Sequence, residues 1–158
     1  MNKAGFDRIK RILDNDRRKL HKELDDIWRE IIYIKYNYTC EMCREKMTPE
    51  ECNAHHVIFR VNFNTRYDLE NGSLLCNYNH NFAPNAPHHD NRKYIGWFNL
   101  HRPEGLYQKL LIKSNEKGGA DKLQIIELIN LKKDLQFKLM ELQTKRDIAR
   151  MSQISTRR

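Results

Sequence analysis

The stretch that decides the fold is residues 69–80, Leu-Glu-Asn-Gly-Ser-Leu-Leu-Cys-Asn-Tyr-Asn-His. Asn71-Gly72 predicts a tight turn. The apolar residues after it predict a short strand that runs into a helix over residues 73–83. Cys76 and His80 place two metal-binding side chains on that strand and helix. The stretch therefore predicts a small unit of strand and helix built around metal-binding side chains.

The rest of the chain extends this unit on both sides and predicts an α+β fold. We expect a helical arm over residues 1–36 and a metal-binding module over residues 37–100, with a strand within 53–62. A connector at 101–119 and a C-terminal helix with a basic tail at 120–158 follow. A chain of 158 residues suits one domain with extensions.

The two flanking helices are predicted from apolar side chains on one face. In residues 4–36 an apolar residue recurs every seven positions, from Phe6 to Ile34. In residues 120–150 leucines form a similar stripe, and Asp121 is a plausible cap. These stripes favour packing on the module or on each other. Pairing with a second copy of the chain, which would make a homodimer, is the alternative.

Bulk properties limit the setting of the protein. The chain is 39% hydrophobic and 32% charged, and it has no run of about 18 apolar residues that would span a membrane. Its first residues lack the apolar segment of a signal peptide. We therefore expect a cytoplasmic protein with no membrane partner. Under reducing conditions four cysteines indicate metal binding or free thiols rather than disulfides.

The positive charge lies mostly outside the central module. The net charge is +8, with 10 Lys and Arg against 7 Asp and Glu in residues 1–36, 8 against 8 in 37–112, and 11 against 6 in 113–158. A phosphate backbone is the partner that this distribution favours. Solvated helix faces and a basic tail are the alternative explanation.

The cysteines predict a structural zinc site. Cys40-x-x-Cys43 lets two thiolates reach one tetrahedral ion, and Cys76 adds a third. The usual fourth cysteine would stand three residues later, where the chain has Asn79, a poor zinc ligand. We expect Cys52 to close the site instead. The alternative is that the cysteines are small buried residues without a metal ion.

The histidines predict a second, reactive site. His55 and His56 are adjacent on the expected strand, so their side chains point to opposite faces. One can bind a metal ion while the other acts as a base toward water. The Asn71 amide can fix the loop between the strands, and His80 can complete the metal site from the helix.

These motifs together resemble the HNH endonuclease family, also called the ββα-metal or His-Me finger nucleases, from Cys40 to about Phe98. The family pattern is a cysteine pair, an Asp-His or His-His doublet, and an asparagine followed by an apolar stretch ending in Leu-Cys-x-x-Cys-His. Residues 66–72 and Trp97-Phe98 resemble phage and restriction-type members. The resemblance implies a central ββα-metal module with a zinc knuckle, flanked here by long helices.

The resemblance also implies a role for each residue. His56 would be the general base and Asn71 would orient its loop. His55 and His80 would hold one catalytic divalent ion, Mg²⁺ or Mn²⁺ or else Zn²⁺ or Ni²⁺. Some members carry another histidine where this chain has Pro84, and His88 or His89 would supply it after a longer loop. The product ends would be 5′-phosphate and 3′-hydroxyl.

DNA is the substrate that the resemblance implies. Four basic residues near the motifs are candidates for phosphate contacts: Arg60, Arg66, Arg92 and Lys93. Two other functions remain open from the sequence. The chain would be a zinc-containing module that binds nucleic acid without cutting it, or an assembly protein that oligomerises through its long helices.

Overall fold

The computed structural model describes residues 3–117 and 123–155. Within these residues the fold is α+β, as predicted, with five α-helices and one two-stranded antiparallel sheet. In chain order the elements are α1 (Lys3–Lys35), β1 (Cys52–His56), β2 (Gly72–Cys76), α2 (Asn77–Asn81), α3 (Asn91–His101), α4 (Leu106–Ser114) and α5 (Ile125–Ser155). Short 3-10 turns, η1 at Pro49–Glu51 and η2 at Leu69–Asn71, precede the strands. The expected cap Asp121 lies outside the described residues.

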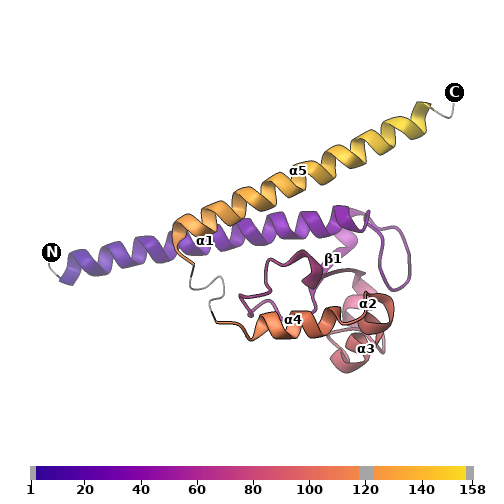
Figure 1. Cartoon of the computed structure of the whole chain (residues 1–158), viewed down its shortest axis with the longest axis horizontal. Helices are drawn as coiled ribbons and strands as arrows, with labels where there is room; N and C mark the ends of the chain where they lie inside the picture. The colour runs from indigo at the N-terminus through magenta and orange to yellow at the C-terminus, as the bar shows by residue number, and fades with distance from the viewer. Residues whose placement is uncertain (1–2, 118–122, 156–158) are drawn as a thin grey trace.

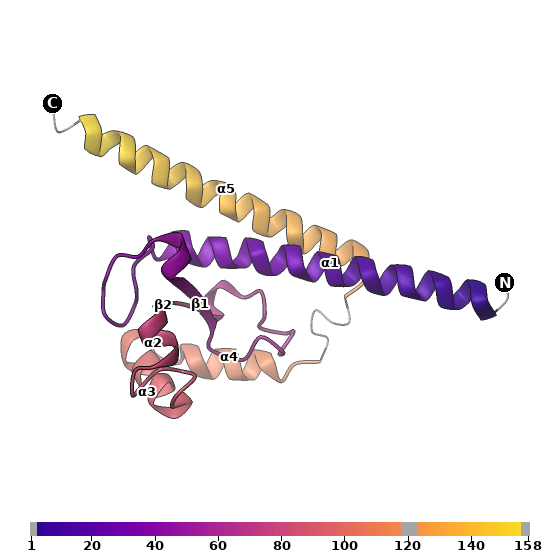
Figure 2. The same ribbon diagram turned by 180° about the vertical axis from the view of Figure 1, so that it is seen from behind.

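Helix α1 lies between two parts of the molecule (Figure 1). Helix α5 packs along one side of α1, and the sheet with α2, α3 and α4 lies on the other side; Figure 2 shows the same arrangement from behind. Four α1 side chains are almost fully buried, and their spacing is that of a helix face: Leu24, Trp28, Ile31 and Ile32. The two long helices therefore pack on each other and on the module.

Strand β1 is shorter than the sequence predicted. It pairs with β2 from Cys52 opposite Cys76 to His56 opposite Gly72. The expected strand over 53–62 is wrong beyond His56. The Val57 N–H still donates to the Asn71 backbone carbonyl oxygen, but the side chain of Asn71 then takes both hydrogen bonds of Ile58. Its Oδ1 accepts from the Ile58 backbone N–H at 2.7 Å, and its Nδ2 donates to the Ile58 carbonyl oxygen at 3.0 Å. The chain leaves the sheet at that point.

The prediction of a tight turn at Asn71-Gly72 is also wrong. Asn71 ends a 3-10 turn and Gly72 begins β2 in an extended conformation, with φ −97°. Glycine is needed there for a different reason. A Cβ atom at Gly72 would lie 2.3 Å from Ile32 Cδ1 of α1. The absence of a side chain therefore lets the sheet pack closely on α1.

The remaining helices cover the module. Asp90 caps α3 by accepting hydrogen bonds from the backbone of Arg92 and Lys93. Tyr94 and Phe98 of α3 are fully buried in the core. The expected connector at 101–119 contains α4, with Leu110 buried. In the described residues, no helix has the length and apolar character needed to cross a bilayer.

Candidate metal centres and active site

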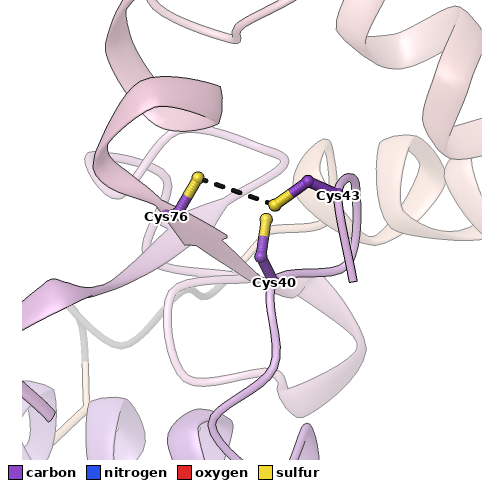
Figure 3. A group of neighbouring side chains, drawn as sticks. All are labelled: Cys40, Cys43 and Cys76. Carbon is purple, nitrogen blue, oxygen red and sulfur yellow. Dashed lines mark hydrogen bonds between the residues drawn. The ribbon is translucent and has the colours of Figure 1, made fainter. Parts of the chain in front are cut away.

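Three thiols converge between the first loop and the end of β2 (Figure 3). The sulfur atoms of Cys40, Cys43 and Cys76 all lie within 4.8 Å of one another, and those of Cys43 and Cys76 are 3.9 Å apart. In a tetrahedral zinc site with Zn–S bonds of about 2.3 Å, sulfur atoms lie roughly 3.8 Å apart. The three thiols therefore have the spacing of three corners of such a site.

Backbone hydrogen bonds set the loop that carries the first two thiols. The Cys40 N–H donates to the Glu45 carbonyl oxygen, and the Arg44 N–H donates to the Cys40 carbonyl oxygen, both at 2.9 Å. Arg44 adopts φ 65°, which closes this tight turn. The turn is held against β2 by Glu41, which sequence reasoning missed. Its buried carboxylate accepts from the Leu74 N–H at 3.0 Å and pairs with Arg102 at 2.9 Å.

Asn79 lies at this group as well. Its backbone N–H points to Cys76 Sγ at 3.5 Å, and the end of its amide lies 3.4 Å from Cys40 Sγ. Burial opposes ionisation of Cys40. Hydrogen bonds from the backbone of Cys43 and Cys76 and from the Asn79 amide more than offset this, and the pKa of the Cys40 thiol is lowered. Cys40 is therefore poised to be a thiolate, the form that binds a metal ion.

The expectation that Cys52 closes this group is not met in the structure. Cys52 is not among the thiols whose ligand atoms lie within 4.8 Å of one another. It is buried at the start of β1, where Tyr33 of α1 donates a hydrogen bond to its carbonyl oxygen. Burial raises the pKa of its thiol to about 11, and the nearby carboxylates of Glu51 and Glu30 add to this. Cys52 thus stays a neutral thiol in the core.

Three imidazoles form a second group. Ring nitrogens of His55, His80 and His88 lie within 4.8 Å of one another. The ring centroids of His80 and His88 are 4.5 Å apart, and His55 lies 5.3 Å from His80 and 5.6 Å from His88. His55 comes from β1, His80 from α2, and His88 from the loop between α2 and α3. Of the two extra histidines that the sequence offered, the structure brings His88 to the group.

The imidazole group has the chemistry of a metal-binding site. Burial, with the charges of His80 and His88, lowers the pKa of His55 to about 3, and burial also lowers the pKa of His80 to about 4. Both rings are therefore neutral at pH 7, which is the form that coordinates metals. His55 Nε2 and His80 Nδ1 are buried and have no hydrogen-bond partner among the described residues. A cation between these atoms would satisfy both.

His56 points away from this group, toward α1. Its ring stacks on Trp28 with centroids 3.9 Å apart and planes 10° apart. Its Nε2 lies 2.9 Å from the Arg66 carbonyl oxygen. Because a carbonyl oxygen only accepts, Nε2 carries the proton, and Nδ1 of the neutral ring has the lone pair. Burial lowers the pKa of His56 to about 4, so the ring is neutral and can accept a proton.

Asn71 fixes the loop that orients His56. It is completely buried, and its Nδ2 donates to the carbonyl oxygens of both Ile58 and Thr65 at 3.0 Å. The next carbonyl along the chain, that of Arg66, accepts the hydrogen bond from His56. Asn71 therefore fixes the loop that carries the Arg66 carbonyl oxygen, and this oxygen orients the His56 ring.

The four basic residues expected at phosphates are placed differently from one another. Arg66 is buried, and its guanidinium donates to both carboxylate oxygens of Asp25 at 2.9 and 2.5 Å, so it serves the packing of the loop on α1. Arg60 is exposed and lies 3.5 Å from Asp25. Arg92 and Lys93 are exposed in the first turn of α3, where Lys93 pairs with Asp90 at 3.5 Å.

A basic cleft of about 770 Å³ lies between the end of α1, the loop that follows it and α5. The ribbons of α1 and α5 diverge toward the end of α1 (Figure 1). Five cationic side chains and no carboxylate line it: Lys35, Lys46, Lys145, Arg146 and Arg150. Arg146 lies over the Tyr38 ring, and its Nε is buried without a hydrogen-bond partner among the described residues. The cleft therefore favours an anion.

Comparison of the chain with protein-family models, curated proteins and solved structures found no match.

Proposed function

We propose that the chain is a metal-dependent DNA endonuclease of the HNH type. One observation carries the proposal. Ring nitrogens of His55, His80 and His88 lie within 4.8 Å of one another, and His55 Nε2 and His80 Nδ1 have no hydrogen-bond partner among the described residues. His56, the next residue of β1, is a neutral imidazole that stacks on α1 and can accept a proton at Nδ1. Phosphodiester hydrolysis needs a site for a cation and a base for water, and two adjacent residues of β1 can supply one of each.

The residues would act as follows. His55, His80 and His88 would hold a divalent ion, which would supply positive charge to stabilise the scissile phosphate and the departing 3′ oxygen. Nδ1 of His56 takes a proton from water while the water oxygen attacks phosphorus. The bond from phosphorus to the 3′ oxygen breaks, and that oxygen takes a proton from solvent. The products carry a 5′-phosphate and a 3′-hydroxyl.

The low pKa of His56 is compatible with this role. The value of about 4 holds for the ring buried against Trp28 with two arginines nearby. A phosphate brought beside the ring adds negative charge, which favours the imidazolium and raises its pKa toward neutrality. The Arg66 carbonyl oxygen accepts a hydrogen bond from His56 Nε2, and Asn71 fixes the loop that carries this carbonyl. The ring therefore does not need to reorient to accept a proton at Nδ1.

A structural zinc ion at Cys40, Cys43 and Cys76 is part of the proposal. The three sulfur atoms have the right spacing, and the pKa of Cys40 is already lowered. The role is structural because the group ties three segments together: the loop after α1, the end of β2, and the start of α2. Helix α2 carries His80, so the thiol group supports the imidazole group through one short helix.

The basic cleft is the surface that we propose for the DNA backbone outside the cut site. It combines residues of both long helices, Lys35 of α1 with Lys145, Arg146 and Arg150 of α5. Cationic side chains in a cleft without carboxylates attract phosphates regardless of base sequence. This matches the charge distribution of the sequence, in which the arms are basic and the module is neutral.

A homodimer through α5 would place two cut sites on two strands. Five exposed apolar side chains of α5 fall on one stripe of the helix, opposite the stripe that faces α1: Ile126, Phe137, Met140, Ile148 and Met151. An apolar stripe of this length on a helix is typical of a surface that pairs with another helix. Sedimentation of the chain would show a dimer, and Phe137→Glu would yield a monomer.

A zinc-containing module that binds nucleic acid without cutting is the second candidate. The stacking of His56 on Trp28 favours it, because a histidine packed on an indole and bonded to a backbone carbonyl also suits a structural role. In that case the chain would bind DNA in a gel-shift experiment without nicking it in any divalent metal.

Nicking of supercoiled plasmid separates the two candidates. Wild-type protein is expected to nick in Mg²⁺, Mn²⁺, Zn²⁺ or Ni²⁺ and to stop when a chelator is added. His56→Ala should bind DNA equally well and nick about 10²–10⁴-fold more slowly, the usual contribution of a general base. Equal nicking by the variant would contradict the assignment of His56.

A further inference from the structure

The thiol group supplies three corners of a tetrahedral site, and the fourth corner decides what kind of site it is. A structural zinc ion is almost always bound by four protein ligands. Cys52 is outside the group. A carboxylate oxygen of Glu45 lies 3.6 Å from Cys43 Sγ, but no further cysteine, histidine or carboxylate among the described residues has its ligand atom within 4.8 Å of all three sulfur atoms. Without a movement of Glu45, the fourth ligand must come from another kind of side chain or from solvent.

We infer that Asn79 is the fourth protein ligand, through its side-chain oxygen. Its amide end lies 3.4 Å from Cys40 Sγ, and its side chain is 7% exposed. In a tetrahedral site with Zn–S bonds of about 2.3 Å and a Zn–O bond of about 2.1 Å, an oxygen ligand lies roughly 3.6 Å from each sulfur. The amide end is thus at the separation that a fourth ligand has.

The amide atom near Cys40 is Nδ2, which donates to the sulfur. The nitrogen and oxygen of an asparagine exchange places by a half-turn about the last side-chain bond. When the Cys40 sulfur binds a cation, the cation replaces the amide hydrogen as its partner. The partial negative charge of Asn79 Oδ1 is then attracted to the same cation. The half-turn then brings Oδ1 to the fourth corner without moving α2.

The backbone around Asn79 is already set for this. Cys76 caps α2, with its Sγ accepting from the Asn79 N–H at 3.5 Å. Cys76 and Asn79 therefore occupy the two ends of a tight turn, the same separation as Cys40 and Cys43. An asparagine side chain at the second position reaches one bond further than cysteine, which suits the shorter zinc–oxygen bond.

The ligand set has a chemical consequence. Three thiolates with a neutral amide give the zinc site a net charge of −1, whereas four thiolates would give −2. An amide oxygen is also a weaker ligand than a thiolate, so the ion is held less tightly. Asn79 is next to His80, so one helical turn supplies a ligand to each of the two groups. The inference does not depend on nuclease activity.

The test is cobalt substitution of the full-length chain. Charge-transfer bands from thiolate to cobalt report only the cysteine site, so cobalt at the imidazoles does not interfere. Wild type should show a tetrahedral spectrum with three thiolates. Asn79→Cys should raise the charge-transfer intensity by about one third and bind zinc more tightly. Asn79→Asp should keep the wild-type intensity, because an oxygen ligand remains.

Two further variants complete the test. Asn79→Ala should weaken zinc binding in a chelator competition by roughly 10–100-fold, the scale of losing one supporting ligand group. Cys52→Ser is the matched control and should leave spectrum and affinity unchanged. Asn79→Ala with the wild-type spectrum and affinity would overturn the inference. So would a Cys52→Ser variant that loses one thiolate band, since Cys52 would then be the ligand.

Discussion

The thiol group and the imidazole group lie on neighbouring segments of the chain but differ in what surrounds their ligand atoms. Cys76 ends β2 directly before α2, which carries His80, and His55 lies on β1, the partner strand of β2. The sulfur of Cys40 accepts backbone and amide hydrogen bonds, whereas His55 Nε2 and His80 Nδ1 have no partner among the described residues. Hydrogen bonds around a ligand fix it in place. Nitrogen atoms without a partner can bind an ion that keeps open coordination positions for water or substrate. The thiol group therefore suits a structural metal ion, and the imidazole group suits a catalytic one.

The largest effect should come from breaking the thiol group. Cys40→Ser removes the thiol whose pKa is lowered. When the free zinc concentration is a thousand times the dissociation constant, zinc binding contributes about 4 kcal/mol to the free energy of unfolding. Thermal unfolding of the zinc-loaded variant should therefore show a loss of about that size. The imidazole group should fail with it, because a helix as short as α2 does not form alone. An unchanged melting curve would contradict a structural role.

Breaking the imidazole group should reduce nicking and leave the thermal stability nearly unchanged. His88→Ala truncates an exposed side chain and leaves the buried Ala83 and Ala86 of the same loop in place, so the melting curve should stay close to wild type. Metal-dependent nicking should fall roughly 10–100-fold. His89→Ala is the matched control, because His89 is adjacent to His88 but outside the group. Equal nicking by the two variants would show that His88 is not a ligand.

The two groups could be predicted from the sequence to different degrees. Cys40, Cys43 and Cys76 were expected together, because the spacing of a cysteine pair and a later cysteine is local chemistry. The sequence alone predicts that Asn79 is a poor zinc ligand, because only the three-dimensional distance to Cys40 shows where its side chain lies. Cys52 was expected in its place, but sequence spacing does not reveal that β1 begins with this thiol in the core beside Glu51 and Glu30.

The same limit explains the other differences. His88 reaches His80 through the loop between α2 and α3, and the path of such a loop is set by tertiary packing. Asn71-Gly72 has the composition of a tight turn, yet Gly72 is there because Ile32 of α1 lies against it. The α+β fold and the two long helices were predictable because their patterns repeat over many residues.

The contact between the sheet and α1 supports both groups, and a smaller change tests it. Gly72→Ala puts a Cβ against Ile32 and should cost about 1–3 kcal/mol of unfolding free energy, the usual cost of overpacking. Gly96→Ala in α3 is the matched control, because nothing lies within 4 Å of its added Cβ. It should stabilise the chain by about 0.5–1 kcal/mol, since alanine is the better helix former. Denaturant titration measures both, and equal effects would contradict the close contact.

The smallest effect concerns the basic cleft, which neither group includes. Removing Lys145 and Arg150 together should weaken DNA binding without changing metal content or the melting curve. If each contacts one phosphate, the slope of log affinity against log salt should fall by about 0.9 for each. Binding measured over a range of salt concentrations gives this slope. Loss of affinity with an unchanged slope would place the DNA elsewhere.

The central claim is that His56 is the general base and that the neighbouring His55, with His80 and His88, binds the metal ion. The most direct measurement is chemical rescue of His56→Ala in plasmid nicking with free imidazole added. The account predicts that the variant is slow, that imidazole restores part of the rate, and that His55→Ala is not restored in the same way because it lacks a metal ligand. A variant that nicks at the wild-type rate without imidazole would contradict the claim.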